Sequence, residues 1–389
     1  MAQPGVATIP NHFAPLSDPR VEGRTAYPLL NIVFMAICAV ICGVDTFTGM
    51  EVFAESKRGW LSRFLDLSAG IPSHDTFNDV LAHLDPAEFE RCLLRWVTSL
   101  VAVSAGQILA IDGKTLRGSY DKADRKAALH MVSVWATKNQ ISLGQQAVAA
   151  KSNEITAIPQ LLELVEIAGG LVTIDAMGCQ KQIAAKIREH GADYVLAVKL
   201  NQGRLYADVA GAFREAMAQD FVGVEHDQYA TEQTGHGRVE YRTYYTLPVQ
   251  DRVRDQAAWA DLTLLGVALR ERQTGDEYGI ESRFYITSRH VTAQEFAAAV
   301  RGHWGIENQL HWQLDVTFRE DASRIRKGHG PHNFSILRRT ALSLLQHDKT
   351  CKNGIAITPE GRLGPEVPRA SPHRRRALKR LPWFAIPRL

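Results

Sequence analysis

The sequence predicts an α/β protein: a mixed sheet with helices on both faces, interrupted by an antiparallel β insertion and preceded by an all-helical N-terminal domain. Apolar residues recur at helical spacing over the first hundred residues, and the period changes to two after Gln107. Strand and helix patterns then alternate, and strand patterns return before a last long helix. The predicted segments of the 389 residues are a helical N-terminal domain (1–104), a core in two parts (105–221 and 291–348), a β-rich insertion (222–290) and an atypical basic tail (349–389).

The most apolar stretch, Tyr27–Val44, is the one candidate for a membrane or signal segment. It lies too far from the N terminus for a signal peptide, and Pro28 and Asn31 interrupt it. We therefore expect a buried helix and no membrane attachment.

A helical hairpin is expected at the end of the N-terminal domain. Ser73 or Asp75 would cap its first helix, and the break "LDP" separates that helix from a second one that starts at Ala87. Such a hairpin either packs against the rest of the protein or enters a DNA groove, and the sequence leaves both interpretations open.

The predicted core begins with the strand "ILAID" and continues with two strands around a turn at 138–139. A helix ending at 169–170, the strand "LVTID", a helix ending at Gly191, the strand "YVLAVK" and a helix at 205–217 follow. In a mixed sheet of this order, the first and fourth strands are expected to be parallel neighbours.

The insertion is predicted from three strand patterns, "RVEYRTYYTLPV", "LTLLGVALRERQ" and "ESRFYITS". Thr292 and Glu295 then form a capping box that starts a long helix reaching Leu314. Beyond Lys349 the chain is rich in Pro and Arg without an amphipathic period, so we expect no regular structure there.

Charge and cysteine content indicate how the protein could bind nucleic acid and in which cellular compartment it works. The net charge is +3, but residues 349–389 hold ten basic and two acidic residues, which leaves 35 basic and 40 acidic residues in the rest of the chain. Binding of nucleic acid would therefore depend on local patches. Five cysteines without a C-x-x-C pair are typical of a reduced, cytoplasmic protein.

Two predicted strands end in a carboxylate, at Asp112 and Asp175. Parallel neighbours lie about 4.8 Å apart, so both side chains would emerge at the same edge of the sheet. Two adjacent carboxylates repel each other unless a cation lies between them. Without clustered imidazoles or thiolates, such oxygen ligands suit Mg²⁺ or Mn²⁺ rather than zinc.

A third carboxylate from the late helix would complete a two-metal site for phosphodiester chemistry. Glu307 in "HWGIENQLHW" is the best candidate, because Ile306 and Leu310 beside it indicate a packed helix. The other candidates are Asp315, Glu320 and Asp321. A single Asp or Glu is more often a helix cap or a surface charge. The prediction of a metal site therefore depends on the combination of two strand-end aspartates with a mid-helix glutamate. The sequence "DGKT" is not a phosphate loop, because Ile108 stands where that motif needs glycine.

The chain also resembles a known family. The stretches "AIDGKTLRGSYD", "KSNEITAIPQLL", "LVTIDAMGCQ", "YVLAVKLNQG", "HGRVEYR" and "HWGIENQLHWQLDVTFREDASRIR" are similar to bacterial insertion-sequence transposases of the As type, or H-repeat-associated proteins. The N-terminal "YPLLNIVFMAICAVICG" and "IPSHDTF" resemble the helical domain that precedes their catalytic domain. The resemblance runs from about Phe13 to Asp348.

The resemblance implies a ribonuclease-H-like fold with a DDE triad of Asp112, Asp175 and Glu307 in "IDGK", "TIDAMG" and "WGIEN". Asp112 would bridge two Mg²⁺ or Mn²⁺ ions, with one ion held by each of the other two carboxylates. The enzyme would cut DNA at the ends of a mobile element and transfer the freed 3′ hydroxyl to target DNA, as a homo-oligomer on double-stranded DNA.

Several residues near the triad are candidate contacts to DNA phosphates. They are Lys114, Arg117, Arg301, His303, Arg324, Arg326 and Lys327. Trp304 and Trp312 would either stack on unpaired bases or pack in the core, and core packing is the more ordinary role of a tryptophan.

The chain departs from related transposases in two places. Where those with a β insertion carry the motif Y-x2-R-x3-E-x6-K, this sequence has Val300, His303 and Leu314 around Glu307. The family resemblance also stops after "KTCKNGIA", so we hypothesise that the tail is a frameshifted replacement of the usual ending. Two alternatives follow: an inactive DNA-binding relic or regulator, and a stand-alone structure-selective nuclease of the same fold.

Overall fold

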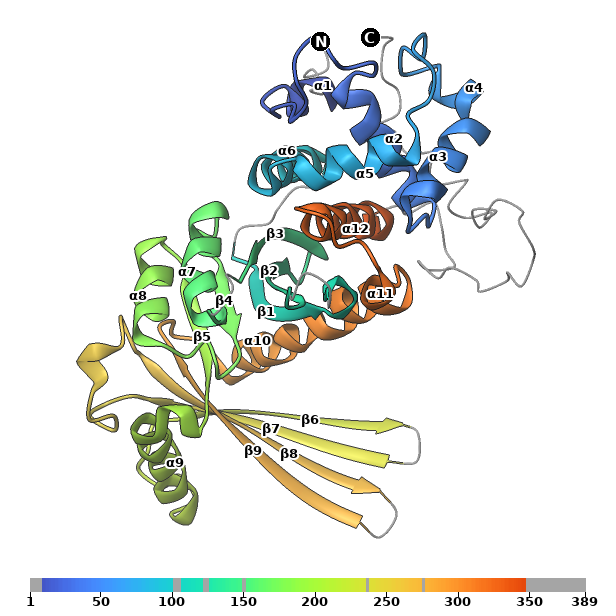
Figure 1. The fold of residues 1–389 in the computed structure, drawn as a ribbon. Coiled ribbons are helices and arrows are strands. Elements are labelled where there is room, and N and C mark those ends of the chain that lie inside the picture. The colour runs from blue at the N-terminus through green and yellow to red at the C-terminus, as the bar shows by residue number, and fades with distance from the viewer. Residues whose placement is uncertain are drawn as a thin grey trace, which may run out of the picture.

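The computed structural model describes residues 9–100, 106–121, 126–148, 152–235, 238–274 and 277–347 (Figure 1). The tail 349–389, with the frameshift hypothesis attached to it, lies outside these residues. A bundle of helices stands at one end of the molecule, a helix-covered sheet lies in the centre, and two long β hairpins project at the other end.

The N-terminal region is helical, as predicted. Its helices are α1 (Ile9–Phe13), α2 (Leu29–Ile41), α3 (Phe47–Ser56), α4 (Arg58–Leu61), α5 (His74–His83) and α6 (Pro86–Leu100). Helix α2 is buried from Asn31 onward, which confirms the buried helix expected at Tyr27–Val44. Ser73 caps α5, since its hydroxyl accepts a hydrogen bond from the Thr76 N–H. No helix within the described residues has the length and apolar run needed to cross a bilayer.

All nine strands form one mixed sheet in the order β3-β2-β1-β4-β5-β9-β8-β7-β6. Strands β1, β4 and β5 are parallel, and the other pairs are antiparallel. The first and fourth strands are therefore parallel neighbours, as expected. Their bounds are β1 (Ile108–Leu116), β2 (Leu129–Ala136), β3 (Ile141–Ala147), β4 (Leu171–Ile174), β5 (Asp193–Val198), β6 (Asp227–Gly235), β7 (Arg238–Pro248), β8 (Leu264–Thr274) and β9 (Glu277–Thr287).

Helices cover both faces of the sheet. Helices α7 (Glu154–Leu164) and α8 (Lys181–Glu189) pack on one face, where α9 (Gly203–Ala218) meets β9 through Phe213 and Phe284. Helix α10 (Ala293–Gly305) crosses the other face, and its capping box of Thr292 and Glu295 is present as predicted. The chain then continues through a π-helical turn, η4 (Ile306–His311), into α11 (Trp312–Val316) and α12 (Gly330–His347). Short 3₁₀ turns are η1 (Arg117–Ser119), η2 (Leu200–Gln202), η3 (Gln256–Ala258) and η5 (Glu320–Ala322).

The insertion contains one strand that the sequence pattern did not predict. Strand β6 (Asp227–Gly235) is an edge strand whose mostly polar sequence, "DQYATEQTG", shows no apolar alternation, so the sequence pattern missed it. Strand β9 pairs with β5, and the insertion therefore extends the core sheet. Helix α7 ends at Leu164, before the predicted stop at 169–170, because Val165 is already extended.

The N-terminal helices contact the core through Glu90 of α6, whose Oε1 accepts a hydrogen bond of 2.6 Å from the Gln145 N–H of β3. Burial raises the pKa of Glu90 to about 8, against the opposing effects of this hydrogen bond and of the Arg339 guanidinium. A carboxyl whose pKa rises on folding stabilises the protein fully below its ordinary pKa near 4.5. That contribution is lost as the pH rises through 8.

We expect the stability of Glu90→Gln relative to wild type to rise by roughly 4 kcal/mol between pH 5 and pH 9, because the wild type loses the contribution of the protonated carboxyl over this range. Glutamine keeps the acceptor oxygen and removes the charge. Urea unfolding at several pH values measures the difference, with Glu55→Gln at an exposed position as the control. A difference that does not change with pH would contradict the prediction.

Candidate functional site

The two strand aspartates lie at neighbouring positions of the sheet. The parallel pairing of β1 and β4 ends at Ile111 and Ile174, and Asp112 and Asp175 are the next residue on each strand. Strand β1 does not end at Asp112 as predicted, because it stays paired with β2 as far as Leu116. Asp112 therefore belongs to a continuous strand, which holds its backbone firmly.

Glu307 reaches this edge from the helix that crosses the sheet. Ile306, Leu310 and Leu314 are fully buried at intervals of four residues and anchor the helix to the core. Glu307 directly follows Ile306, and His311 directly follows Leu310. Both therefore lie within the π-helical turn η4. Single π turns inside helices are frequent at functional sites.

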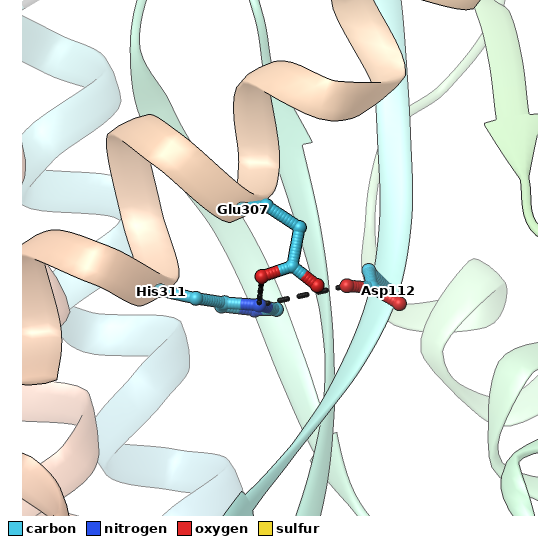
Figure 2. Close-up of side chains that lie close together, drawn as sticks. All are labelled: Asp112, Glu307 and His311. Carbon is cyan, nitrogen blue, oxygen red and sulfur yellow. Dashed lines mark ion pairs between the residues drawn. The ribbon is translucent and has the colours of Figure 1, made fainter. Parts of the chain in front are cut away.

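Three donor groups meet at this place: Asp112, Glu307 and His311 (Figure 2). The His311 Nδ1 lies 3.5 Å from the Asp112 Oδ2 and 3.4 Å from the Glu307 Oε2. Figure 2 shows the glutamate and the imidazole projecting from one helix toward the aspartate on its strand. One donor atom from each residue lies within 4.8 Å of the other two, close enough to hold one metal ion.

The electrostatics of this cluster favour a cation. Burial and the neighbouring Glu307 carboxylate raise the pKa of Asp112 to about 8, while His311 beside Glu307 lowers the pKa of that carboxyl to about 2. Without a cation, the pair therefore keeps a proton on Asp112 at neutral pH. A carboxylate pair in this state fits a divalent ion, which would replace the proton and relieve the repulsion.

Asp175 lies outside this group of three but lines the same hollow, of about 780 Å³, together with Asp112 and Glu307. Its Oδ1 accepts hydrogen bonds from the backbone N–H groups of Met177 (3.0 Å) and Gly178 (3.4 Å). These bonds fix the carboxylate at the end of β4.

His303 lines the hollow as well. Its Nδ1 lies 3.2 Å from the Thr173 hydroxyl, and burial lowers the pKa of the imidazole. If the hydroxyl donates to Nδ1, the proton of the neutral ring is on Nε2, which can then donate to a phosphate oxygen.

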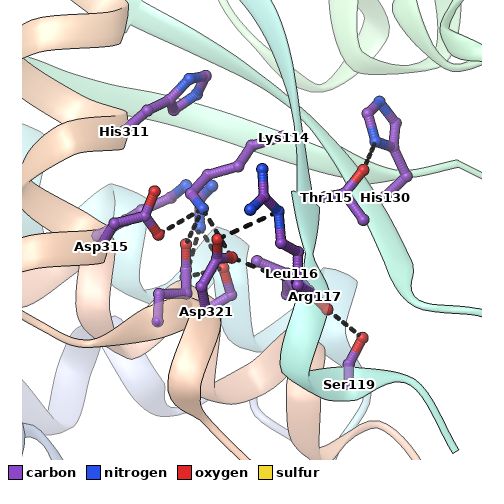
Figure 3. Close-up of polar contacts among 12 residues, drawn as sticks. Lys114, Thr115, Leu116, Arg117, Ser119, His130, His311, Asp315 and Asp321 are labelled. Atoms are coloured by element: carbon purple, nitrogen blue, oxygen red, sulfur yellow. Dashed lines mark hydrogen bonds and ion pairs between the residues drawn. The ribbon is translucent and has the colours of Figure 1, made fainter.

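Lys114 has a different environment from the predicted phosphate contact. The side chain is buried, and its Nζ lies 2.7 Å from Asp315, 3.2 Å from Asp321 and 3.8 Å from Glu320 (Figure 3). These carboxylates follow the Glu307 helix in the chain. Lys114 therefore connects β1 to the segment after that helix, and the prediction of a DNA contact is corrected to an internal ion-pair cluster. Asp315, Glu320 and Asp321, the other candidates for the third metal ligand, are therefore partners of Lys114.

The other predicted DNA contacts differ in exposure. Arg117 is exposed, lies 3.5 Å from Asp321 and projects beside the Lys114 cluster (Figure 3). Arg301 and Arg324 are exposed, whereas Arg326 is half-buried and donates to the Gly118 carbonyl. Lys327 pairs with Asp79 of helix α5 at 2.9 Å, so it connects the core to the N-terminal helices.

Trp304 and Trp312 are not core residues, although core packing was the more ordinary expectation. Their side chains are 46% and 53% exposed. Trp304 lines the first hollow and also a second one, of about 530 Å³, which shares Glu281, Arg283 and Val300 with the first. The Arg283 guanidinium lies over the Trp304 ring, 4.7 Å from its centre.

Sequence reasoning missed His311 and the arginines of this second hollow. His311 could have been found from its position four residues after Glu307, which puts both side chains on one side of a helix. The arginines are Arg242, Arg270 and Arg283. They come together only through the strand register, which pairs Arg242 with Arg270 and Ala268 with Arg283.

Comparison with known proteins identifies the family of the chain. A family model described as "Transposase DDE domain" matches residues 104–344, and one described as "DDE_Tnp_1-associated" matches residues 10–97. "Putative transposase YncI" of Escherichia coli O157:H7 is 41% identical over 90% of both chains. "H repeat-associated putative transposase YhhI" of Escherichia coli K12 is 40% identical over 88% of this chain and 92% of its own. The chain belongs to the DDE transposase family, whose ribonuclease-H-like fold it has.

Proposed function

We propose that this protein cuts DNA at the ends of a mobile element and joins the freed 3′ ends to target DNA. Asp112, Asp175 and Glu307 would hold two divalent ions, Mg²⁺ or Mn²⁺. The observation that supports this best is the register of β1 and β4, with two aspartates at one edge beside the helix of Glu307. When bound, the ions would supply an activated water or 3′ hydroxyl and stabilise the leaving oxygen.

The residues of the chain have separate tasks in this proposal. The rigid β1 backbone fixes Asp112, and the hydrogen bonds from Met177 and Gly178 fix Asp175. Glu307 is about half exposed toward the hollow and completes the set. His303, neutral because burial lowers its pKa, would donate a hydrogen bond to a phosphate oxygen without adding charge.

The DNA strand would leave the site along the second hollow. This surface carries Arg242, Arg270, Arg283 and Arg301. Glu240 pairs with the first two and Glu281 with Arg283, which still leaves an excess of positive charge. Arginines here would contact phosphates, and Trp304 would stack on an unpaired base next to the cut. Because an element has two ends, we propose a homo-oligomer on the DNA, acting on the nucleoid in the bacterial cytoplasm.

The experiment is a cleavage assay on duplexes that carry the terminal repeats flanking the gene. Wild-type protein with Mg²⁺ or Mn²⁺ should nick the element end and join it to a target duplex, and Glu307→Gln should do neither. Equal cutting of scrambled or branched duplexes would instead indicate a structure-selective nuclease. Binding without any cutting would indicate an inactive relic or regulator.

We expect Trp304→Ala to weaken binding of an element end with an unpaired flank by about tenfold, since stacking of one base contributes roughly 1–3 kcal/mol. Trp312→Ala is the matched control, because this tryptophan is equally exposed but lines neither hollow. Fluorescence anisotropy measures both affinities. Equal losses in the two variants would contradict the assignment of Trp304.

A further inference from the structure

His311 is a buried imidazole whose Nδ1 faces two carboxylates, and the DDE triad gives it no task. Its side chain is 5% exposed. The Nδ1 distances of 3.4 and 3.5 Å to Glu307 and Asp112 exceed the usual length of an N–H···O hydrogen bond, about 2.7–3.2 Å. Neighbouring ligand atoms of an octahedral ion with bonds of about 2.1 Å lie about 3 Å apart. The two Nδ1–oxygen distances would need to shorten only slightly to hold such an ion.

The second ring nitrogen has no competing contact. Within the described part of the chain, the buried His311 Nε2 has no hydrogen-bond partner. The polar contacts of the ring therefore lie at Nδ1, which faces the two carboxylates. Burial of an unsatisfied imidazole costs free energy, which a function at the cluster would explain.

We propose that His311 is a nitrogen ligand of the ion that Asp112 and Glu307 share, and that it makes this site prefer Mn²⁺ to Mg²⁺. The inference rests on the proposed metal-dependent function and adds to it the identity of the ion. An imidazole nitrogen binds first-row transition ions well and Mg²⁺ poorly, whereas carboxylates accept either ion. The purely oxygen-based site expected from the sequence is thereby replaced at one ion by a mixed site.

The test is pulsed electron paramagnetic resonance on the full-length protein with one equivalent of Mn²⁺ and no DNA. Wild type should show the ¹⁴N coupling of a directly bound imidazole, and protein labelled with ¹⁵N-histidine should show the ¹⁵N pattern instead. His311→Gln should lose the coupling. His303→Gln should keep it, because that histidine lies in the same hollow with its Nδ1 against Thr173.

Metal affinity provides the second measurement. Mn²⁺ binding, followed by its free-ion signal, should weaken about tenfold or more in His311→Gln, while Mg²⁺, measured by competition, should weaken less than about threefold. The labelled wild type answers the question even if His311→Gln does not fold. Absence of nitrogen coupling in wild type, its loss in His303→Gln, or equal weakening of both ions would overturn the proposal.

These results are separate from the test of the proposed function. Nitrogen coupling with no cleavage of element ends would retain the metal site and reject the transposition chemistry. Cleavage with no nitrogen coupling would retain the transposition chemistry and reject His311 as a metal ligand.

Discussion

Replacing Asp112 with asparagine will slow metal-dependent cleavage of element ends by roughly 10³-fold or more, without loss of folding stability. Asparagine has nearly the same shape but is a poor ligand for a hard cation, so about 4 kcal/mol of transition-state stabilisation is lost. Burial and the neighbouring Glu307 carboxylate raise the pKa of Asp112, so an ionised Asp112 is unfavourable in the folded protein without metal. Asparagine is neutral at every pH, so thermal unfolding without metal should occur at the same or a higher temperature than in wild type.

Two measurements on the same preparation check this prediction. Cleavage of the element-end duplex gives the catalytic loss, and anisotropy in the absence of metal shows whether DNA affinity is retained. Gain of stability together with loss of activity is the signature of a functional carboxylate. A clear fall in unfolding temperature, with cleavage retained, would identify Asp112 as a structural residue and refute the site.

The sequence predicted the helical N-terminal region, the mixed sheet and the pairing of its first and fourth strands, because these depend on local periodicity and chain order. Asp112 and Asp175 could be placed at one edge for the same reason, since parallel neighbours in this order bring equivalent ends together. Strand β6 was missed because an edge strand needs few apolar residues. Its pairing with β7 depends on backbone hydrogen bonds, which the sequence pattern does not report.

The environment of a charged side chain was harder to predict than its position. Lys114 lies in "IDGKT", a polar stretch that suggests an exposed side chain. Its partners, however, lie some 200 residues further along the chain. Gly113 has no side chain, yet the space beside it is not open, because the Glu154 carboxylate and the His130 ring occupy it. In both cases long-range packing decided the outcome, and the sequence carries no period or spacing that reports it.

We expect Lys114→Met to destabilise the protein by roughly 3 kcal/mol, because removing the buried ammonium leaves its partly buried carboxylate partners without their shared cation. Methionine keeps the length and apolar body of lysine, so packing is little changed. Glu320 is fully buried but keeps the Arg339 guanidinium at 3.4 Å, so most of the cost arises at Asp315 and Asp321, which make the shorter contacts to Lys114. Urea unfolding measures the loss of free energy.

The matched control is Arg117→Met, which removes a cation from the same Asp321 at a side chain that is 81% exposed. Exposed ion pairs contribute about 1 kcal/mol or less, so this variant should stay close to wild type. Lys114→Met should also weaken Mn²⁺ binding, because the cluster connects the strand of Asp112 to the chain that follows His311. If both variants lose the same small amount of stability, the Lys114 cluster is an ordinary surface network, and Lys114 returns to the candidates for DNA contact.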